Sequence, residues 1–454
     1  MAAINADSGS YPPEMIGYAE PWIAAPGDSV AIKGIEIDHS PEKAEEEVLE
    51  IPRGHQKGRF QTVHQGSYGS VPNWGAPNKA EGLRVSLYMQ PWMVECSHAQ
   101  TLISTLDPIT NTGFSITLNT SGSLDVHIGT VQGVDIIRTE LRPENKCWSK
   151  VKVLFTCQRL QVKLVHLPFR VEPVPPPAAV EQILNKTTPV LSPNPLLIAA
   201  TKAIFSRSGP GCQGPYVTEV FNGRIDCLTL ETHDQRPLVL AEYDFSLNME
   251  SDQIVDVSGR AHHGVLINAP TRAVQGHDWD GSECDGTPAK SGYGAIPFHD
   301  DDMDDAQWDT GFIITIPRTA RSGAYAVEVK TVNALDKDSI TFFVRPNSWT
   351  SDNSQKVCLV FSIFTYLAYA NERLYDTTRQ NTADLGPGFD INTCLKSAES
   401  DKMRHRGDLG LSCYDRHNDG SGVCYSSAKR PILNLRPGYI MWAFSCPREF
   451  SAVL

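Results

Sequence analysis

Short segments in which apolar and polar residues alternate recur between residues 82 and 165, and they constrain the fold more than any other feature. The clearest of them cover residues 83–89, 114–118, 126–128, 150–155 and 160–164. Successive side chains of a strand point to opposite faces, so this alternation predicts strands with one buried face. Their short, regular spacing, with turn residues between them, is typical of an antiparallel β-sandwich.

Further strand signals lie on both sides of this region, at residues 16–18 and 29–32 and then at 311–316, 324–329 and 340–344. The N-terminal 75 residues alone are too few for a sound core. We therefore predict that residues 1–75 and 295–346 together form a small Ig-like β-sandwich. The larger sandwich then occupies residues 76–294.

Two segments do not fit this alternating pattern. Seven prolines fall within residues 173–195, which predicts a loop or linker inside an insertion at 171–215. Residues 357–361 are a continuous apolar run, as expected of a strand buried on both faces of a parallel sheet. Fewer than a hundred residues follow that run, so we predict an incomplete α/β domain at 347–454.

Composition excludes several classes of function. The net charge is −13, which disfavours nucleic acid or an anionic membrane as the main partner. The N-terminus lacks the basic start and apolar run of a signal peptide, and no apolar stretch is long enough to span a membrane. None of the 11 cysteines forms a C-x-x-C pair. We expect a cytoplasmic protein with reduced thiols.

A first resemblance lies in the middle of the chain. Residues 221–226, 243–246 and 255–264 resemble strands and a turn of laminin-G/concanavalin-like sandwiches. Within the last of these segments, Ser258 and Gly259 would turn the chain. We predict that Asp256 braces that turn by hydrogen bonds from its side chain to the backbone.

A second resemblance covers most of the chain. Residues 16–19, 270–274, 298–302, 343–346, 365–371 and 414–422 look like the large (beta) subunit of N,N-dimethylformamidase, and the last two segments are the most specific. The N-terminal sandwich is shortened relative to the family pattern. The resemblance implies an α/β domain similar to the glutamine-amidotransferase class I fold. It also implies a small partner subunit, with a homo-oligomer as the alternative.

The activity implied by this resemblance is an iron-dependent hydrolysis of the C–N bond of a small amide, with release of formate. In the family the iron is held by a tyrosinate and by the histidine and glutamate of a His-Pro-Glu stretch. His-Pro-Glu is absent from this sequence. Since one protein ligand cannot fix an open catalytic geometry, we expect this chain to be inactive on its own.

Carried over residue by residue, the resemblance makes Tyr414 a ligand of the iron and makes Tyr366 and Tyr369 catalytic. His417 and Asp419 would support the site from behind the ligands. Each residue also has a structural alternative: core aromatics for Tyr366 and Tyr369, a surface tyrosine for Tyr414, and loop bracing for His417 and Asp419.

Two further alternatives concern the acidic run and the class of protein. Residues 299–305 are acidic but lack the spacing of an EF-hand loop, so we interpret them as a solvated or fold-bracing loop. The nucleophile elbow, the P-loop and the H-E-x-x-H helix are also absent. The resemblance to laminin-G-like sandwiches, which often bind sugars or proteins through edge loops, implies the alternative function: a non-catalytic sandwich that binds carbohydrate or protein.

Overall fold

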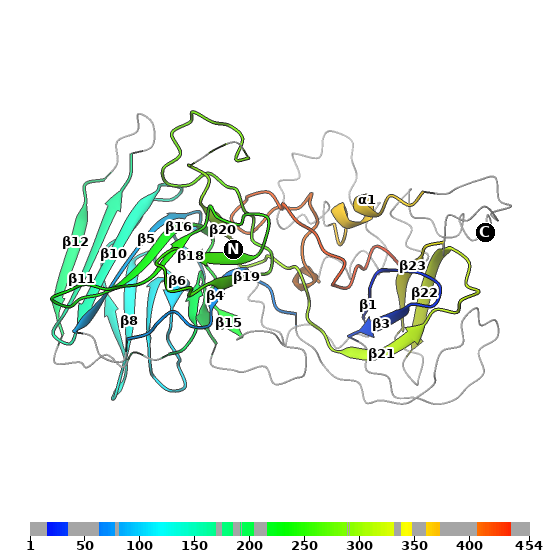
Figure 1. Cartoon of the computed structure of the whole chain (residues 1–454), viewed down its shortest axis with the longest axis horizontal. Helices are drawn as coiled ribbons and strands as arrows, with labels where there is room; N and C mark the ends of the chain where they lie inside the picture. Colours follow the sequence, from blue (N-terminus) through cyan, green and yellow to red (C-terminus); the bar gives the residue numbers. More distant parts are fainter. Residues whose placement is uncertain are drawn as a thin grey trace.

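The computed structural model of the chain describes residues 16–34, 63–77, 81–168, 175–184, 191, 193–203, 216–287, 289, 291–330, 337–346, 360–372 and 406–436. These residues are mostly β-structure. Figure 1 shows a large sandwich at one end and a small group of strands at the other. The segment 406–436, drawn in orange, runs between them. No helix among these residues is both long and apolar enough to cross a membrane.

The large sandwich is a 15-stranded antiparallel sheet folded over on itself. Its strand order is β12-β11-β10-β5-β16-β17-β18-β19-β4-β13-β6-β7-β8-β9, and β20 pairs with β16. The strands that come first in the chain are β4 (Tyr68–Val71), β5 (Gly82–Pro91), β6 (Gln100–Ser104), β7 (Phe114–Leu118), β8 (Leu124–Thr130), β9 (Gly133–Arg138), β10 (Ser149–Thr156) and β11 (Arg159–His166). Those that follow are β12 (Ala178–Ile183), β13 (Leu196–Ile198), β16 (Gly223–Thr232), β17 (Val239–Asp244), β18 (Gln253–Asp256), β19 (Gly264–Ile267) and β20 (Ile296–Phe298).

The alternation in the sequence sets which side chains enter the core of this sandwich. In β5, Leu83, Val85 and Leu87 are buried while the residues between them are half-buried. Val85 lies opposite Val153 of β10 and opposite Leu230 of β16. Apolar side chains from both halves of the folded sheet join in one cluster, so the predicted antiparallel sandwich is confirmed.

The proline-rich segment differs from the prediction. The interpretation of residues 173–195 as a loop or linker is wrong for β12, which pairs with β11 over six residues. Residues 178–183 contain no proline, and β12 is an edge strand whose side chains are almost all exposed. An edge strand needs one partner only and can therefore follow directly after prolines. Farther along, β13 pairs with both β4 and β6.

The small group of strands combines a segment that precedes the large sandwich in the sequence with one that follows it. One three-stranded sheet has the order β1-β3-β21, formed by β1 (Tyr18–Glu20), β3 (Ser29–Lys33) and β21 (Thr310–Thr315). The other has the order β2-β23-β22, formed by β2 (Ile23–Ala24), β23 (Lys337–Val344) and β22 (Gly323–Lys330). Their buried side chains, among them Ile32, Ile314 and Phe342, form one core. The strand β4 lies within residues 1–75 but pairs with β13 and β19 of the large sheet. The predicted domain boundaries stay a prediction.

Little regular structure occurs in the described residues beyond β23. They contain the short helix α1 (Ile363–Ala368) and the 3-10 turn η2 (Gly407–Leu409). A two-stranded sheet of β14 (Thr201–Lys202) and β15 (Val217–Thr218) completes the elements. Of the predicted apolar strand, residues 357–359 lie outside the described part, and Val360 and Phe361 have no regular structure. The α/β domain also stays a prediction.

Candidate functional site

The three tyrosines of the predicted site lie on and beside α1, and two of them stack on each other. The rings of Tyr369 and Tyr414 stack with centroids 4.2 Å apart and planes 20° apart. A hydrogen bond between the two phenols raises the pKa of Tyr369. Tyr366 instead stacks on Phe343 of β23, with a centroid distance of 6.3 Å. The structure therefore brings the most specific motifs together through Tyr369 and Tyr414, with Tyr414 54% exposed.

Asn371 connects the motif at residues 365–371 to the segment 406–436, which contains the motif at residues 414–422. It is buried and has a φ of 57°, in the left-handed region that asparagine tolerates better than most residues. Its Nδ2 donates to the carbonyls of Leu409 and Pro431, and its Oδ1 accepts from the backbone N–H of Leu433. One side chain thus fixes the turn that follows α1 against three points of the segment 406–436.

Arg430 holds the same segment from within. The side chain is 1% exposed and donates to the carbonyls of Leu409 and Leu411 and to Ser426 Oγ. Gly410, with a φ of 87°, lies against the guanidinium, where an added Cβ would collide with it. These contacts replace a regular helix or strand as the means of satisfying buried backbone carbonyls.

A second group of side chains lies where the segment 406–436 meets the acidic run. His417 Nδ1 lies 2.6 Å from Asp301 Oδ1, and the His417 ring stacks on that of His299 with centroids 3.8 Å apart. His299 Nδ1 lies 3.1 Å from Asp302 Oδ2, and its Nε2 lies 3.5 Å from Asp419 Oδ2. His417 and Asp419 were predicted from the sequence, whereas His299, Asp301 and Asp302 were not assigned to a site. We call these five residues the His–Asp cluster.

Burial and charge oppose each other in this cluster. Burial favours a neutral imidazole, but the hydrogen bond to Asp302 and the charges of Asp302, Asp419 and Asp301 raise the pKa of His299. Burial would raise the pKa of Asp301, yet the hydrogen bond and charge of His417 lower it. His299 and Asp301 are each 5% exposed, so the solvated alternative for residues 299–305 is wrong for these two side chains. The bracing alternative agrees with their contacts.

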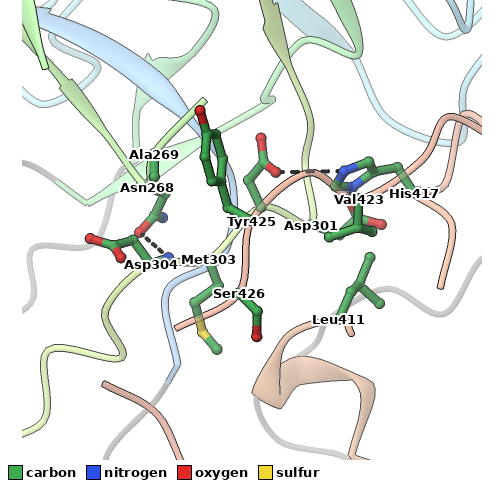
Figure 2. A pocket seen from close by; sticks show the side chains of 11 residues that line it. Asn268, Ala269, Asp301, Met303, Asp304, Leu411, His417, Val423, Tyr425 and Ser426 are labelled. Carbon is green, nitrogen blue, oxygen red and sulfur yellow. Dashed lines mark hydrogen bonds and ion pairs between the residues drawn. The ribbon is translucent and has the colours of Figure 1, made fainter. Parts of the chain in front are cut away.

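A small pocket opens beside the cluster. Its lining comes from the acidic run, from the turn at residues 268–269 and from the segment 411–426 (Figure 2). In Figure 2 the Asp301 carboxylate and the His417 ring lie at one side of this pocket, joined by their hydrogen bond. The lining residues are Asn268, Ala269, Asp301, Asp302, Met303, Asp304, Leu411, His417, Val423, Tyr425 and Ser426.

Tyr414 does not join either group of side chains that could hold a metal ion among the described residues. One such group is Asp226, Cys227 and His277, and the other is His299, Asp302 and His417. The imidazole of His417 is turned toward Asp301 and stacks on His299. Within the described part, Tyr414 is thus one candidate ligand beside a second phenol, and these residues do not complete the iron site that the resemblance implies.

The comparisons with known proteins agree with the motifs. A model described as "N,N-dimethylformamidase beta subunit-like, C-terminal" matches residues 271–451. The N,N-dimethylformamidase beta subunit of Paracoccus aminophilus is 30% identical over 473 aligned residues, which cover 93% of this chain. The chain resembles the beta subunit of N,N-dimethylformamidase. The corresponding subunit of an Alcaligenes species is 38% identical over 205 residues, or 44% of this chain. This chain covers 60% and 26% of the lengths of those two relatives.

Solved structures overlap with the chain only loosely. The LG1-3 region of the laminin alpha2 chain has a TM-score of 0.27 and 10% identity, covering 38% of this chain and 31% of that chain. A carbohydrate-binding protein from Bacteroides ovatus, itself described as putative, has a TM-score of 0.29 and 12% identity, covering 52% of this chain and 66% of that chain. Overlap at this level carries no functional argument, and the sandwich is defined by its own strand pairing.

Proposed function

We propose that this chain serves the hydrolysis of the C–N bond of small amides such as N,N-dimethylformamide, with release of formate. The observation that carries the proposal is the pairing of Tyr369 with Tyr414. It brings together the two motifs most specific to the dimethylformamidase resemblance at a surface where Tyr414 is 54% exposed. Two phenols side by side can orient a small amide or a water by hydrogen bonds.

The cofactor and the partner follow from the same resemblance. Iron, with Tyr414 as one ligand, is the proposed metal, and it would polarise the amide carbonyl when bound. The described residues supply this one ligand, beside the ring of Tyr369. Because the relatives are named beta subunits, we also propose that a second kind of subunit accompanies this chain.

The proposal is tested by measuring formate and dimethylamine released from N,N-dimethylformamide in the presence of Fe²⁺. We expect release by the protein isolated from its native cells and none by the purified 454-residue chain alone. If neither preparation releases formate, the proposed amide hydrolysis is contradicted. Normal turnover by the 454-residue chain would contradict the expectation that it is inactive alone.

Tyrosine variants of the native protein test the role of the pair. Replacing Tyr414 with Phe should lower turnover by at least about 100-fold, because it removes the phenol proposed to bind iron, and Tyr369→Phe should lower it by about 10-fold. Tyr325→Phe is the control, since Tyr325 lies on β22 and donates its hydroxyl to the carbonyl of Arg321, outside the candidate site. Full activity in Tyr414→Phe would exclude this tyrosine from the site.

A further inference from the structure

We propose that His299, Asp302 and His417 form a binding site for a divalent transition-metal ion, separate from the tyrosine pair. The nitrogen and oxygen atoms that these three side chains offer all lie within 4.8 Å of one another. They come from the two motifs at residues 298–302 and 414–422, which are more than a hundred residues apart in the sequence. The inference does not depend on the proposed hydrolysis.

The distances between these atoms suit a small cation. Asp302 Oδ2 is 3.1 Å from His299 Nδ1, and Asp302 Oδ1 is 3.7 Å from His417 Nε2. In a tetrahedral site with bonds of 2.0–2.2 Å, ligand atoms lie about 3.3–3.6 Å apart. The carboxylate of Asp302 thus faces one nitrogen of each ring at nearly the separation that a shared ion requires. The stacked rings must tilt apart for their in-plane lone pairs to converge on it.

The remaining ring nitrogens are already held by other groups. His417 Nδ1 is paired with Asp301 Oδ1 at 2.6 Å. His299 Nε2 lies 3.0 Å from Ser421 Oγ and 3.5 Å from Asp419 Oδ2. Histidines that bind metal usually donate their other N–H to a carboxylate, a carbonyl or water, which fixes the tautomer and the direction of the lone pair. His417 has this arrangement with the Asp301 carboxylate, and His299 has the hydroxyl of Ser421 in the same place.

Charge in the cluster also favours a cation. The side chains of Asp301 and Asp419 are 6% and 0% exposed, and Asp302 adds a third carboxylate at 15%. Asp419 Oδ2 is buried and makes no hydrogen bond in the described part of the chain, although it points at His299. A buried carboxylate oxygen left without a donor is costly unless positive charge lies beside it. A divalent ion bound by the two imidazoles beside Asp302 would add positive charge to this cluster.

The ligand set narrows the choice of ion. Two imidazoles and one carboxylate suit Zn²⁺ and Fe²⁺ and leave a coordination position free, whereas Ca²⁺ and Mg²⁺ prefer oxygen ligands alone. The pocket beside Asp302 and His417 gives the ion a route from solvent. A bound ion would also fasten the segment 406–436 to the end of the large sandwich, next to β20.

The first experiment is titration of Zn²⁺ into the chelator-treated full chain, followed by calorimetry and thermal unfolding. We expect about one saturable site per chain and a rise in Tm of several degrees. His299→Gln and His417→Gln should each weaken binding by at least about 100-fold. His277→Gln is the matched control, because His277 belongs to the other group that could hold a metal and should leave this binding unchanged.

X-ray absorption of the Zn²⁺-loaded chain gives an answer even where a variant does not fold. We expect nitrogen and oxygen neighbours at about 2.0–2.1 Å with imidazole scattering and no sulfur. A sulfur neighbour near about 2.3 Å would place the ion at a cysteine, Cys227 being one candidate, and would overturn the proposal. Absence of saturable binding, or binding that His277→Gln abolishes and His417→Gln does not, would overturn it equally.

Discussion

The large sandwich and the segment 406–436 are held together in different ways. The sandwich buries apolar side chains from both halves of one folded sheet, including Phe114, Phe155 and Phe221, each at most 1% exposed. The segment 406–436 has one 3-10 turn as its regular element and depends on polar side chains such as Asn371 and Arg430. Burial of apolar area acts without direction, whereas hydrogen bonds require particular partners.

This difference matters for function because the candidate site residues lie mainly in the polar region. Tyr414, His417 and Asp419 all belong to the segment 406–436, and their partners come from the C-terminal cap of α1 and from the acidic run. Segments with few apolar contacts open more easily than sandwich cores. We therefore expect that the site can be disordered by substitutions that leave the sandwich folded, and that the converse does not hold.

The largest effect is expected from opening a cavity in the sandwich. Phe114 packs edge-on against Trp74 and at a tilt against Phe155, with centroid distances of 6.3 and 5.3 Å. Phe114→Ala should lower the free energy of unfolding of the sandwich by about 4 kcal/mol. Urea unfolding followed by tryptophan fluorescence measures it. The control is Phe364→Ala on α1, where the side chain is 88% exposed and a change below about 0.5 kcal/mol is expected. Equal effects of the two substitutions would contradict the assignment of this core.

A smaller and local effect is expected from Arg430→Ala. The substitution leaves the carbonyls of Leu409 and Leu411 without their buried donor, which we expect to destabilise the segment 406–436 by about 3 kcal/mol. Amide hydrogen exchange should show faster exchange at residues 409–435 and unchanged protection in β5 and β10.

Arg416→Ala provides the comparison for Arg430→Ala. Arg416 is exposed and donates to the carbonyl of Gly420 in the same segment. The substitution Arg416→Ala should leave amide hydrogen exchange nearly unchanged, because an exposed hydrogen bond is replaced by one to water. If Arg430→Ala instead lowers protection throughout the sandwich, the two regions unfold as one unit and the contrast between them is wrong.

The difference between the sandwich and the segment 406–436 also determines how much of each could be predicted from the sequence. The alternation at residues 83–89 predicted β5 because each strand residue reports its own face, and no distant contact is needed to interpret it. The prediction that Asp256 braces the turn at Ser258 is confirmed for the same reason. Its Oδ1 accepts from the backbone N–H of Ser258, two residues away. Contacts between residues that are close in the sequence can be predicted from a short segment.

Contacts over long separations had no such signal. His299 and His417 stack on each other, yet the sequence marked their two motifs separately and carried no information that they meet. The acidic run was therefore interpreted without its partner, and burial of His299 and Asp301 was missed. The edge strand β12 was missed for a different reason, because neighbouring prolines outweighed six residues that are free of them. A histidine within an acidic run, together with a second histidine in another motif of the same resemblance, is the signal that could have suggested the cluster.

The smallest effect is expected at Asp256, and it depends on pH. Burial would raise the pKa of this carboxyl, but hydrogen bonds from the backbone N–H groups of Glu242, Ser258 and His262 lower it. A folded-state pKa below the unfolded value of about 3.9 adds stability above that pH, and this stability is lost as pH falls through the folded pKa. Asp256→Asn should therefore reduce the free energy of unfolding by about 2 kcal/mol at pH 7, with the difference vanishing in more acidic solution.

Urea unfolding of both proteins from about pH 7 to about pH 2.5, a range that spans the unfolded pKa, measures this difference. Asp280→Asn is the control, since Asp280 accepts from the backbone N–H of Ser282 in an exposed loop outside the sheet. It should change stability little at any pH, because solvent replaces its hydrogen bonds. A stability difference for Asp256→Asn that is equally large at the lowest pH would mean that the protonated side chain braces the turn as well as the carboxylate does. The negative charge of Asp256 would then not be needed to stabilise this turn of the sandwich.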